Sequence, residues 1–302
     1  MTDSNVVYYS NGLYIKSVLH FPELQTSTNA PDVSITFGKF PDVLKEANYS
    51  DNFQQINLQE YQLNMPSIAK FLVKNTNEVI IDAYPNADVA DIRMYFLASI
   101  LPVLVHKHNL LPLHSCSINI NGNVFLIGGV SGAGKSTFAL GMHRKGYDIL
   151  NDDVSTIGFD ETDNPIAYIG YRQIKLLTES LENYGYELTD FEKLNTEITK
   201  FRFPLQDEIS HNSLPIKAVF LLEHDPQKEV VDIQELKGLE SFLQLTKNTF
   251  RVELLRELGL KKNHFDLCSK IAQKIKVFKV SRPQNMRPEE FSTHMEKLFL
   301  TF

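Results

Sequence analysis

The sequence predicts an α/β protein in which a mixed sheet carries a glycine-rich loop and a β-rich part comes first. An apolar strand at 124–127 runs directly into a glycine-rich loop and then into a helix. Two hairpin patterns fall within the first 87 residues, and apolar segments typical of strands and helices alternate after the loop. We therefore expect a β-rich part over 1–87 that packs on a larger body over 88–302.

The N-terminal part is expected to consist of hairpins and loops. Asn11-Gly12 separates apolar runs at 6–10 and 13–19, a strong pattern for a two-residue hairpin turn. Three further strands are expected, at 34–37, 68–73 and 79–82. Loops are expected where Pro, Asn, Asp and Gln accumulate, at 22–32 and 38–60.

A helix and another hairpin lead to the glycine-rich loop. Asp88 or Asp91 caps a helix that continues to about His106. A strand at 113–120, the Asn121-Gly122 turn and a strand at 123–127 then form a hairpin. An antiparallel strand is therefore expected directly beside the strand that enters the loop.

The segment after the loop alternates between helices and strands. A helix from Lys135 ends near Gly146, and a short strand at 147–150 leads into Asn151-Asp152-Asp153. Further strands are expected at 154–159, 198–203, 216–223, 230–235 and 275–280. Further helices are expected at 238–247, 251–258, 264–274 and 288–300.

The composition is that of an ordinary globular protein. The 302 residues are 43% hydrophobic and 22% charged, and the net charge is −7, which disfavours a nucleic-acid partner. Cys116 and Cys268 lie far apart in the sequence, and the N-terminus has no signal-peptide pattern, so we expect a cytoplasmic protein. The longest apolar stretch, 94–105, is too short to span a bilayer, so no membrane partner is expected.

The glycine-rich loop is the strongest functional pattern. Residues 129–136 fit G-x-x-x-x-G-K-[ST], a motif whose backbone N–H groups converge on phosphate oxygens. Lys135 is placed to reach the β- and γ-phosphates, and the Ser136 hydroxyl to bind Mg²⁺. The cofactors expected are therefore ATP and Mg²⁺. The residues expected to contact the nucleotide are Gly129, Ser131, Gly132, Ala133, Gly134, Lys135, Ser136 and Thr137.

Two carboxylates and a histidine are expected near this loop. Asp152 and Asp153 follow a strand, where phosphoryl transfer would use carboxylates to bind Mg²⁺ and to accept the proton of the attacking hydroxyl. The same Asn-Asp-Asp run is also good turn chemistry. His114 lies on the strand next to the loop, where it could bond Asp153 or the phosphoryl group, although a lone histidine is often structural.

These segments together resemble the catalytic domain of HPr serine kinase/phosphorylase. The resemblance rests on Leu-Pro-Leu-His-Ser-Cys-Ser-Ile, the Asn-Gly turn, the phosphate loop and Tyr-Asp-Ile-Leu-Asn-Asp-Asp-Val, and it is specific over about 111–155. It implies the fold of the HPr kinase and phosphoenolpyruvate carboxykinase group. It also implies that Asp153 takes the substrate proton, that His114 supports it, and that Asp152 is a second metal or hydrogen-bond partner.

Parts of the sequence depart from that family. Gln173 stands at the nearest counterpart of a metal-binding glutamate, which weakens a second metal contact. The family's Pro-Gly-Arg-Asn segment, whose arginine is tied to the phosphorolysis reaction, is absent, so the dephosphorylating reaction is not expected. The first hundred residues do not match the regulatory domain of the HPr enzyme. Three basic residues are candidates to contact phosphate or an acidic substrate: Lys200, Arg202 and Arg251. The alternative for each of these side chains is a solvated or salt-bridged surface charge.

We expect a Mg²⁺/ATP-dependent kinase that phosphorylates a hydroxyl. Later segments, at 214–223 and 247–255, resemble HPr-kinase-like proteins outside the HPr regulatory system. Some of those are encoded with peptide-modification clusters, such as lasso-peptide biosynthesis, which implies a serine of a peptide or small protein as the acceptor. The alternatives are a small-metabolite kinase, a nucleotide-dependent switch and a noncatalytic binding module. The GTPase motif Asn-Lys-x-Asp and the ABC-type Ser-Gly-Gly-Gln run are absent, which favours a kinase. Relatives include hexamers, so a homo-oligomer stays among the expectations.

Overall fold

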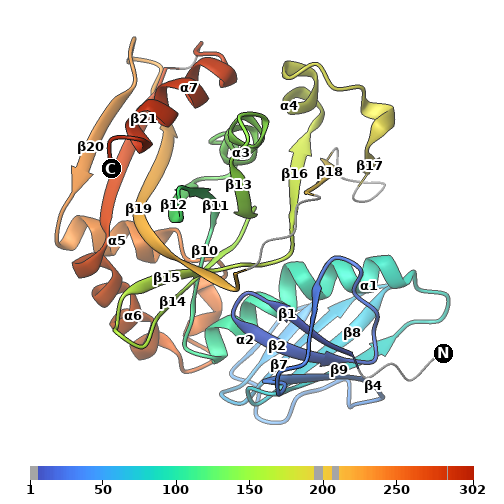
Figure 1. Cartoon of the computed structure of the whole chain (residues 1–302). Coiled ribbons are helices and arrows are strands. Elements are labelled where there is room, and N and C mark those ends of the chain that lie inside the picture. The colour runs from blue at the N-terminus through green and yellow to red at the C-terminus, as the bar shows by residue number, and fades with distance from the viewer. Residues whose placement is uncertain (1–5, 194–199, 206–210, 284) are drawn as a thin grey trace. The chain divides into compact units, whose positions relative to one another are not determined.

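A nine-stranded sheet lies at the centre of each of the two units into which the chain divides (Figure 1). The computed structural model describes residues 6–193, 200–205, 211–283 and 285–302. The first unit comprises Met1–Pro112 and Phe250–Leu267, and the second comprises Leu113–Thr249 and Cys268–Phe302. The helix that follows residue 88 falls within the first unit.

The sheet of the first unit has the order β3-β1-β2-β4-β9-β8-β7-β6-β5. Its strands are β1 (Val6–Ser10), β2 (Leu13–Ser17), β3 (Gln25–Ser27), β4 (Val33–Phe37), β5 (Tyr49–Ser50), β6 (Gln54–Ile56), β7 (Glu60–Met65), β8 (Ala69–Lys74) and β9 (Glu78–Ala83). The two predicted hairpins are confirmed, β1 with β2 and β8 with β9. Asn11 and Gly12 both have positive φ, as the turn between β1 and β2 requires.

The loops expected at 22–32 and 38–60 were partly wrong, because four strands begin within them. β3, β5 and β6 are at most three residues long and mostly polar, so no alternation of apolar and polar residues marks them. β7 begins at Glu60, at the end of the second segment. The hydrogen bonds of the sheet, rather than local pattern, define these strands.

The predicted helix is confirmed and runs from Val89 to Lys107 as α1 (Val89–Tyr95), a π-helical turn (Phe96–Ile100) and α2 (Leu101–Lys107). Asp88 caps it by accepting a hydrogen bond from the N–H of Ala90 at 2.8 Å. The ring of Phe96 packs 5.3 Å from that of Phe21 in the same unit.

This helix is also long and apolar enough to cross a membrane, the one such helix in the described part of the chain. The expectation based on the shorter stretch 94–105 therefore underestimated its length. Because 61% of its most apolar 18-residue window is buried in the protein, the helix has the burial of a core helix.

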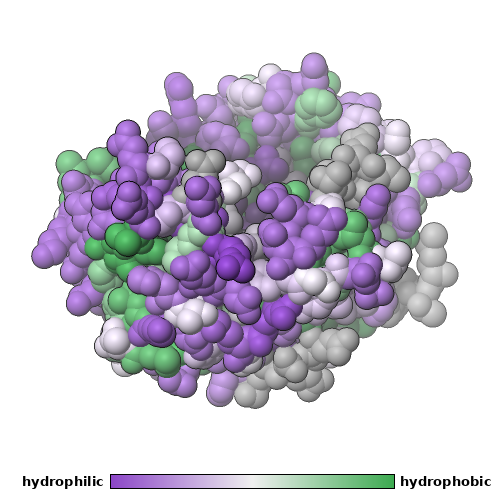
Figure 2. Space-filling model, turned by 90° about the horizontal axis from the view of Figure 1, so that it is seen from above, coloured by the Kyte–Doolittle hydropathy of each residue, from purple (hydrophilic) through white to green (hydrophobic). Residues whose placement is uncertain are grey.

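The face drawn in Figure 2 is mostly hydrophilic, with hydrophobic residues in scattered groups.

The sheet of the second unit is mixed, as the sequence predicts. Its strands are β10 (Leu111–Leu113), β11 (Ser115–Ile120), β12 (Asn123–Gly129), β13 (Asp148–Asn151), β14 (Ser155–Phe159), β15 (Pro165–Tyr168), β19 (Ser213–His224), β20 (Asp232–Leu236) and β21 (Lys276–Arg282). β12, β19 and β21 run parallel, and β11 lies antiparallel between β12 and β13. The carboxyl ends of β12 and β13 therefore meet the amino end of β11 at one edge of the sheet.

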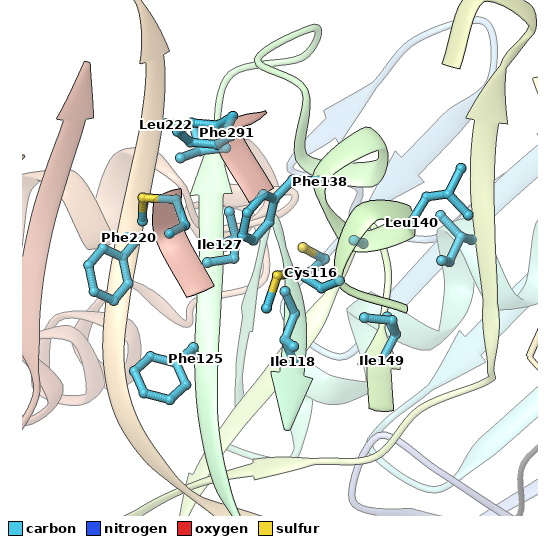
Figure 3. Packing of buried hydrophobic residues seen from close by; sticks show 14 of the residues in the cluster. Cys116, Ile118, Phe125, Ile127, Phe138, Leu140, Ile149, Phe220, Leu222 and Phe291 are labelled. Carbon is cyan, nitrogen blue, oxygen red and sulfur yellow. The ribbon is translucent and has the colours of Figure 1, made fainter. Parts of the chain in front are cut away.

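Two helices cover this sheet and close the core of the second unit. They are α3 (Lys135–Arg144) and α7 (Pro288–Phe299). The close-up in Figure 3 shows Phe138 of α3 between strand residues such as Ile127 and Cys116. Phe138 also packs 5.4 Å from Phe291 of α7, measured between ring centroids. Truncating a buried ring of this kind to alanine costs about 3–5 kcal/mol.

A small three-stranded sheet in the order β16-β18-β17 and a short helix belong to the same unit. They are β16 (Gln173–Leu177), β17 (Glu192–Lys193), β18 (Lys200–Pro204) and α4 (Thr178–Asn183). β16, β17 and α4 were not predicted, because the short run 173–177 has no strict alternation. The first two residues of the strand expected at 198–203 lie outside the described residues.

The helices predicted at 238–247 and 264–274 are present with shifted ends, but only a short 3₁₀ turn stands where a helix was predicted at 251–258. These elements are α5 (Leu239–Lys247), the 3₁₀ turn (Val252–Leu255) and α6 (Lys261–Lys274).

Candidate active site

The glycine-rich loop joins β12 to α3, as its motif predicts. Gly129 and Gly134 both have positive φ, at 135° and 91°. A Cβ on Gly129 would lie only 2.4 Å from the carbonyl oxygen of Leu222 on β19, so no side chain fits at the start of the loop. The N–H of Phe138 donates to the carbonyl of Gly134 at 2.9 Å, which begins the helix directly after the loop. The loop therefore ends at a helix N-terminus, where an anion is favoured.

Lys135 lies folded back over the loop. Its Nζ donates to the carbonyl oxygens of Gly129 at 2.8 Å and Val130 at 3.1 Å. The side chain is largely buried, and this burial lowers the pKa of Lys135. The Nζ of Lys135 is thus held by neutral carbonyl oxygens of the loop itself.

Ser136 and Asp152 bring a hydroxyl and a carboxylate together at the start of α3. The Ser136 Oγ–H donates to Asp152, with Oγ 2.9 Å from Oδ1 and 3.2 Å from Oδ2. Burial raises the pKa of Asp152, while hydrogen bonds from the Lys175 N–H (2.8 Å) and Ser136 act in the opposite direction. A divalent cation would stabilise the ionised form of this buried carboxylate. One carboxylate and one hydroxyl beside a glycine-rich loop are a donor set that fits Mg²⁺.

Asp153 lies between two basic side chains. Its Oδ1 is 3.4 Å from Nε2 of His114, and its Oδ2 accepts a hydrogen bond from Nζ of Lys175 at 3.1 Å. Burial alone would raise the pKa of Asp153, but the contact with His114 and the charge of Lys175 outweigh it and hold that pKa well below its usual range. In turn, burial would lower the pKa of Lys175, and the charges of Tyr171 and Asp153 raise it overall. Asp153 is thus an ionised carboxylate with fixed neighbours.

The strand order explains why these side chains meet. β11 pairs with β12 on one side and with β13 on the other, so His114, just before β11, lies at the edge where β12 and β13 end. The Asn151 amide donates to Ser117 Oγ at 2.9 Å and to the carbonyl of Tyr168 at 2.8 Å, which fixes the end of β13. Asp153 then has a φ of 76°, a turn conformation that Asp tolerates.

These groups line a cavity of about 570 Å³ within the second unit. The predicted residues that line it are His114, Ser131, Gly132, Gly134, Lys135, Ser136, Thr137, Asp153 and Lys200. Leu177, Glu179, Ser180 and Asn183 add a wall from β16 and α4. Thr137 and Ser180 join the loop side to this wall through a hydroxyl–hydroxyl hydrogen bond of 2.8 Å.

Six residues singled out in the sequence do not line this cavity: Gly129, Ala133, Asp152, Gln173, Arg202 and Arg251. Gly129 starts the loop against Leu222, and Ala133 is buried. Gln173 is buried at the start of β16 and Asp152 lies beneath Ser136. Arg202 shares a face of β18 with Lys200, as predicted, but forms an ion pair with Glu192 at 3.7 Å. Arg251 belongs to the first unit, where Nη2 donates to Ser99 Oγ at 3.3 Å. A role for Arg202 or Arg251 in binding phosphate stays a prediction.

Sequence reasoning missed three basic residues that line the cavity. Lys175 lies two positions after Gln173, and the unpredicted strand β16 delivers it to Asp153. Arg282 and His224 are paired at the ends of β21 and β19. Both strands were predicted, so the rule that parallel strands end at one edge could have identified the last two.

Comparisons with known proteins give a distant likeness only. No family model matches the sequence, and no curated protein matches it. Among solved structures, the chain is similar to the HPr(Ser) kinase/phosphatase from Coxiella burnetii, with a TM-score of 0.33 and 13% identity. That match covers 63% of this chain and 97% of the other. At this TM-score, the chain's own residues must carry any functional proposal.

Proposed function

We propose that this chain is a Mg²⁺/ATP-dependent kinase that transfers the γ-phosphoryl group to a hydroxyl, that of a serine of a peptide or small protein. The observation that carries the proposal is the position of Asp153. An ionised carboxylate, bounded by His114 and Lys175, lines the same cavity as the phosphate loop. A general base and a phosphate-binding loop within one cavity are what transfer to a hydroxyl requires.

The chemistry assigned to Asp153 is proton acceptance. The acceptor oxygen forms a bond to the γ-phosphorus, the bond from that phosphorus to the β–γ bridging oxygen breaks, and the hydroxyl proton passes to the Asp153 carboxylate. ADP leaves with the bridging oxygen. Since the transition state is loose, with little bond formation to the incoming oxygen, a carboxylate of low pKa suffices if it is well positioned. The contacts with His114 and Lys175 support that positioning.

The phosphate side of the cavity would be formed by the loop. Lys135 would exchange its carbonyl contacts for phosphate oxygens, and the N–H groups of the loop would surround the rest of the triphosphate. Ser136 and Asp152 would hold Mg²⁺, which when bound neutralises charge on the β- and γ-phosphates. Because Ser136 and Asp152 already contact each other, little movement is needed to share one cation.

The test is transfer from radiolabelled ATP to candidate acceptors by the full chain. Serine-containing peptides, free serine and an acceptor-free reaction are compared, and mass spectrometry locates the phosphate. The expected result is Mg²⁺-dependent phosphoserine on a peptide. Label on free serine alone would favour the small-metabolite kinase, and acceptor-independent hydrolysis would favour the nucleotide-dependent switch. Nucleotide binding without any turnover would favour the binding module.

The Asp153→Asn variant tests the assigned base. Asn accepts the positive φ of this position, so we expect the fold and nucleotide binding to persist while kcat falls by about 10²- to 10⁴-fold. Asp266→Asn removes an equal charge from an exposed position of α6 and is the matched control. Full transfer by Asp153→Asn would remove Asp153 from the mechanism.

A further inference from the structure

Arg282, the last residue of β21, reaches the loop side of the cavity. A Cβ on Gly134 would lie 3.4 Å from Nη1 of Arg282 and 3.9 Å from its Cζ. Gly134 directly precedes α3, so the guanidinium lies at the N-terminal end of that helix. Backbone N–H groups and the helix dipole already favour an anion at this point. A second source of positive charge is therefore added beside the phosphate loop.

The guanidinium is held in place by its surroundings. Its Cζ lies 5.2 Å from the centroid of the Phe291 ring, which is fully buried against Phe138. The carbonyl of Arg282 accepts a hydrogen bond from the N–H of Asp225 at 3.1 Å, and β19 pairs along the strand as far as His224. Both the backbone and the planar head of the side chain are thus ordered by the fold.

The described residues place no carboxylate against this charge. Among the residues that the structure describes, no carboxylate lies within ion-pair distance of Arg282, and its buried Nε has no hydrogen-bond partner. Arg93 and Arg202, by contrast, are paired with Glu23 and Glu192. Burial lowers the pKa of Arg282, because the loss of water around the guanidinium disfavours its charged form. An orphaned buried donor beside an anion-binding helix end indicates that the partner is a ligand.

We infer that Arg282 binds the β- and γ-phosphates of the nucleotide, an inference that rests on the proposed kinase function. A guanidinium presents parallel N–H donors that match phosphate oxygens, and stacking on Phe291 leaves these donors free to face the loop. Arg282 then supplies the cationic side chain for which the sequence suggested Lys200, Arg202 or Arg251. Its charge also offsets the charge that gathers on the bridging oxygen as ADP leaves.

The experiment measures nucleotide affinity of the full chain by calorimetry, with no turnover required. ATP, ADP and AMP are titrated into the wild type and into Arg282→Gln, Arg282→Lys and Arg287→Gln. Arg287 is an exposed residue that precedes α7 and does not line this cavity, so its variant matches the charge change. Circular dichroism and thermal unfolding verify that each variant is folded. Arg282→Lys keeps the charge and serves where Arg282→Gln fails to fold.

The expected result is a loss of affinity for ATP and ADP of about 10- to 100-fold in Arg282→Gln, the range for a lost charge-assisted hydrogen bond. The affinity of Arg282→Gln for AMP should be unchanged. The ATP affinity of Arg282→Lys should lie between those of the wild type and Arg282→Gln, and the ATP affinity of Arg287→Gln should match the wild type. Unchanged ATP affinity, or an equal loss for AMP, would overturn the inference. A wild-type chain that binds no nucleotide would instead overturn the proposed function.

Discussion

Nε2 of His114 lies 3.4 Å from Oδ1 of Asp153, although 38 residues of sequence separate them. The two come together because β11 pairs antiparallel with β13, so His114, just before β11, lies beside the end of β13. Lys175 approaches the other oxygen of the same carboxylate from the small sheet. The orientation of Asp153 is therefore set from two different sheets of the second unit.

Replacing Lys175 with Met should raise the pKa of Asp153, since the cation that lowers it is removed. Only the ionised carboxylate accepts a proton, so the acidic limb of the kcat/KM profile should move to higher pH. The measurement is the pH dependence of phosphoryl transfer. Lys200→Met removes a charge from the same cavity without touching Asp153 and should leave that limb in place. A limb that stays fixed in Lys175→Met would contradict the assigned contact.

Replacing Ser136 with Ala should weaken Mg²⁺ binding and leave the fold intact. The hydroxyl is one of two oxygen groups that would bind the cation, and its loss leaves Asp152 alone. The Mg²⁺ concentration for half-maximal activity should rise by about 10-fold or more, equivalent to about 1.4 kcal/mol. Ser136→Thr retains the hydroxyl and should stay near the wild type. Equal Mg²⁺ requirements in both variants would exclude Ser136 as a ligand.

Replacing Gly129 with Ala should unfold the loop locally and abolish nucleotide binding. The new Cβ would meet the Leu222 carbonyl oxygen at 2.4 Å, at a φ that side chains rarely adopt. Backbone strain and overpacking together should cost about 2–5 kcal/mol of unfolding free energy. Gly122→Ala is the control, since it also has a positive φ but nothing lies within 4 Å. It should lose only about 1–2 kcal/mol and bind nucleotide normally, as urea unfolding and calorimetry would show.

The first unit should lose stability in acid through His106. Burial lowers the pKa of His106 to about 4, while its Nε2–H donates to the carbonyl of Phe250 at 2.8 Å. The unfolded chain binds the proton more readily, so this contribution is complete above about pH 6.5 and falls away toward pH 4, by up to about 1.4 kcal/mol per pH unit. Urea unfolding across that range measures it. His106→Gln keeps a donor without titrating and should flatten the curve, and an unchanged slope would contradict the assignment.

The sequence predicted most of the second unit's central elements because their patterns are local. The apolar strand, the glycine loop and the Asn121-Gly122 turn each specify their own backbone, and β11, β12, β13 and α3 appear where expected. The encounter of His114 with Asp153 also followed, since a hairpin that ends in the glycine loop brings its first strand beside that loop.

The missing parts depend on contacts between segments that are distant in the sequence. β16 is a five-residue strand whose partner β18 follows more than twenty residues later, and no local pattern reveals that pairing. Lys175 was therefore absent from the predicted site. Arg282 was overlooked for a different reason: its strand was predicted, but only the three-dimensional order of parallel strands shows that it ends beside Gly134.

The Asn121-Gly122 turn lies at the far end of the hairpin that enters the loop. Six residue pairs join β11 to β12 between the turn and the glycine-rich loop, which places the turn about 20 Å from the start of that loop. Gly122 is exposed and a Cβ there would touch nothing. New chain ends opened at this turn, as in a circular permutant, would thus leave every strand of the cavity intact. The hairpin thereby offers a natural place to attach a reporter domain without disturbing the residues that line the cavity.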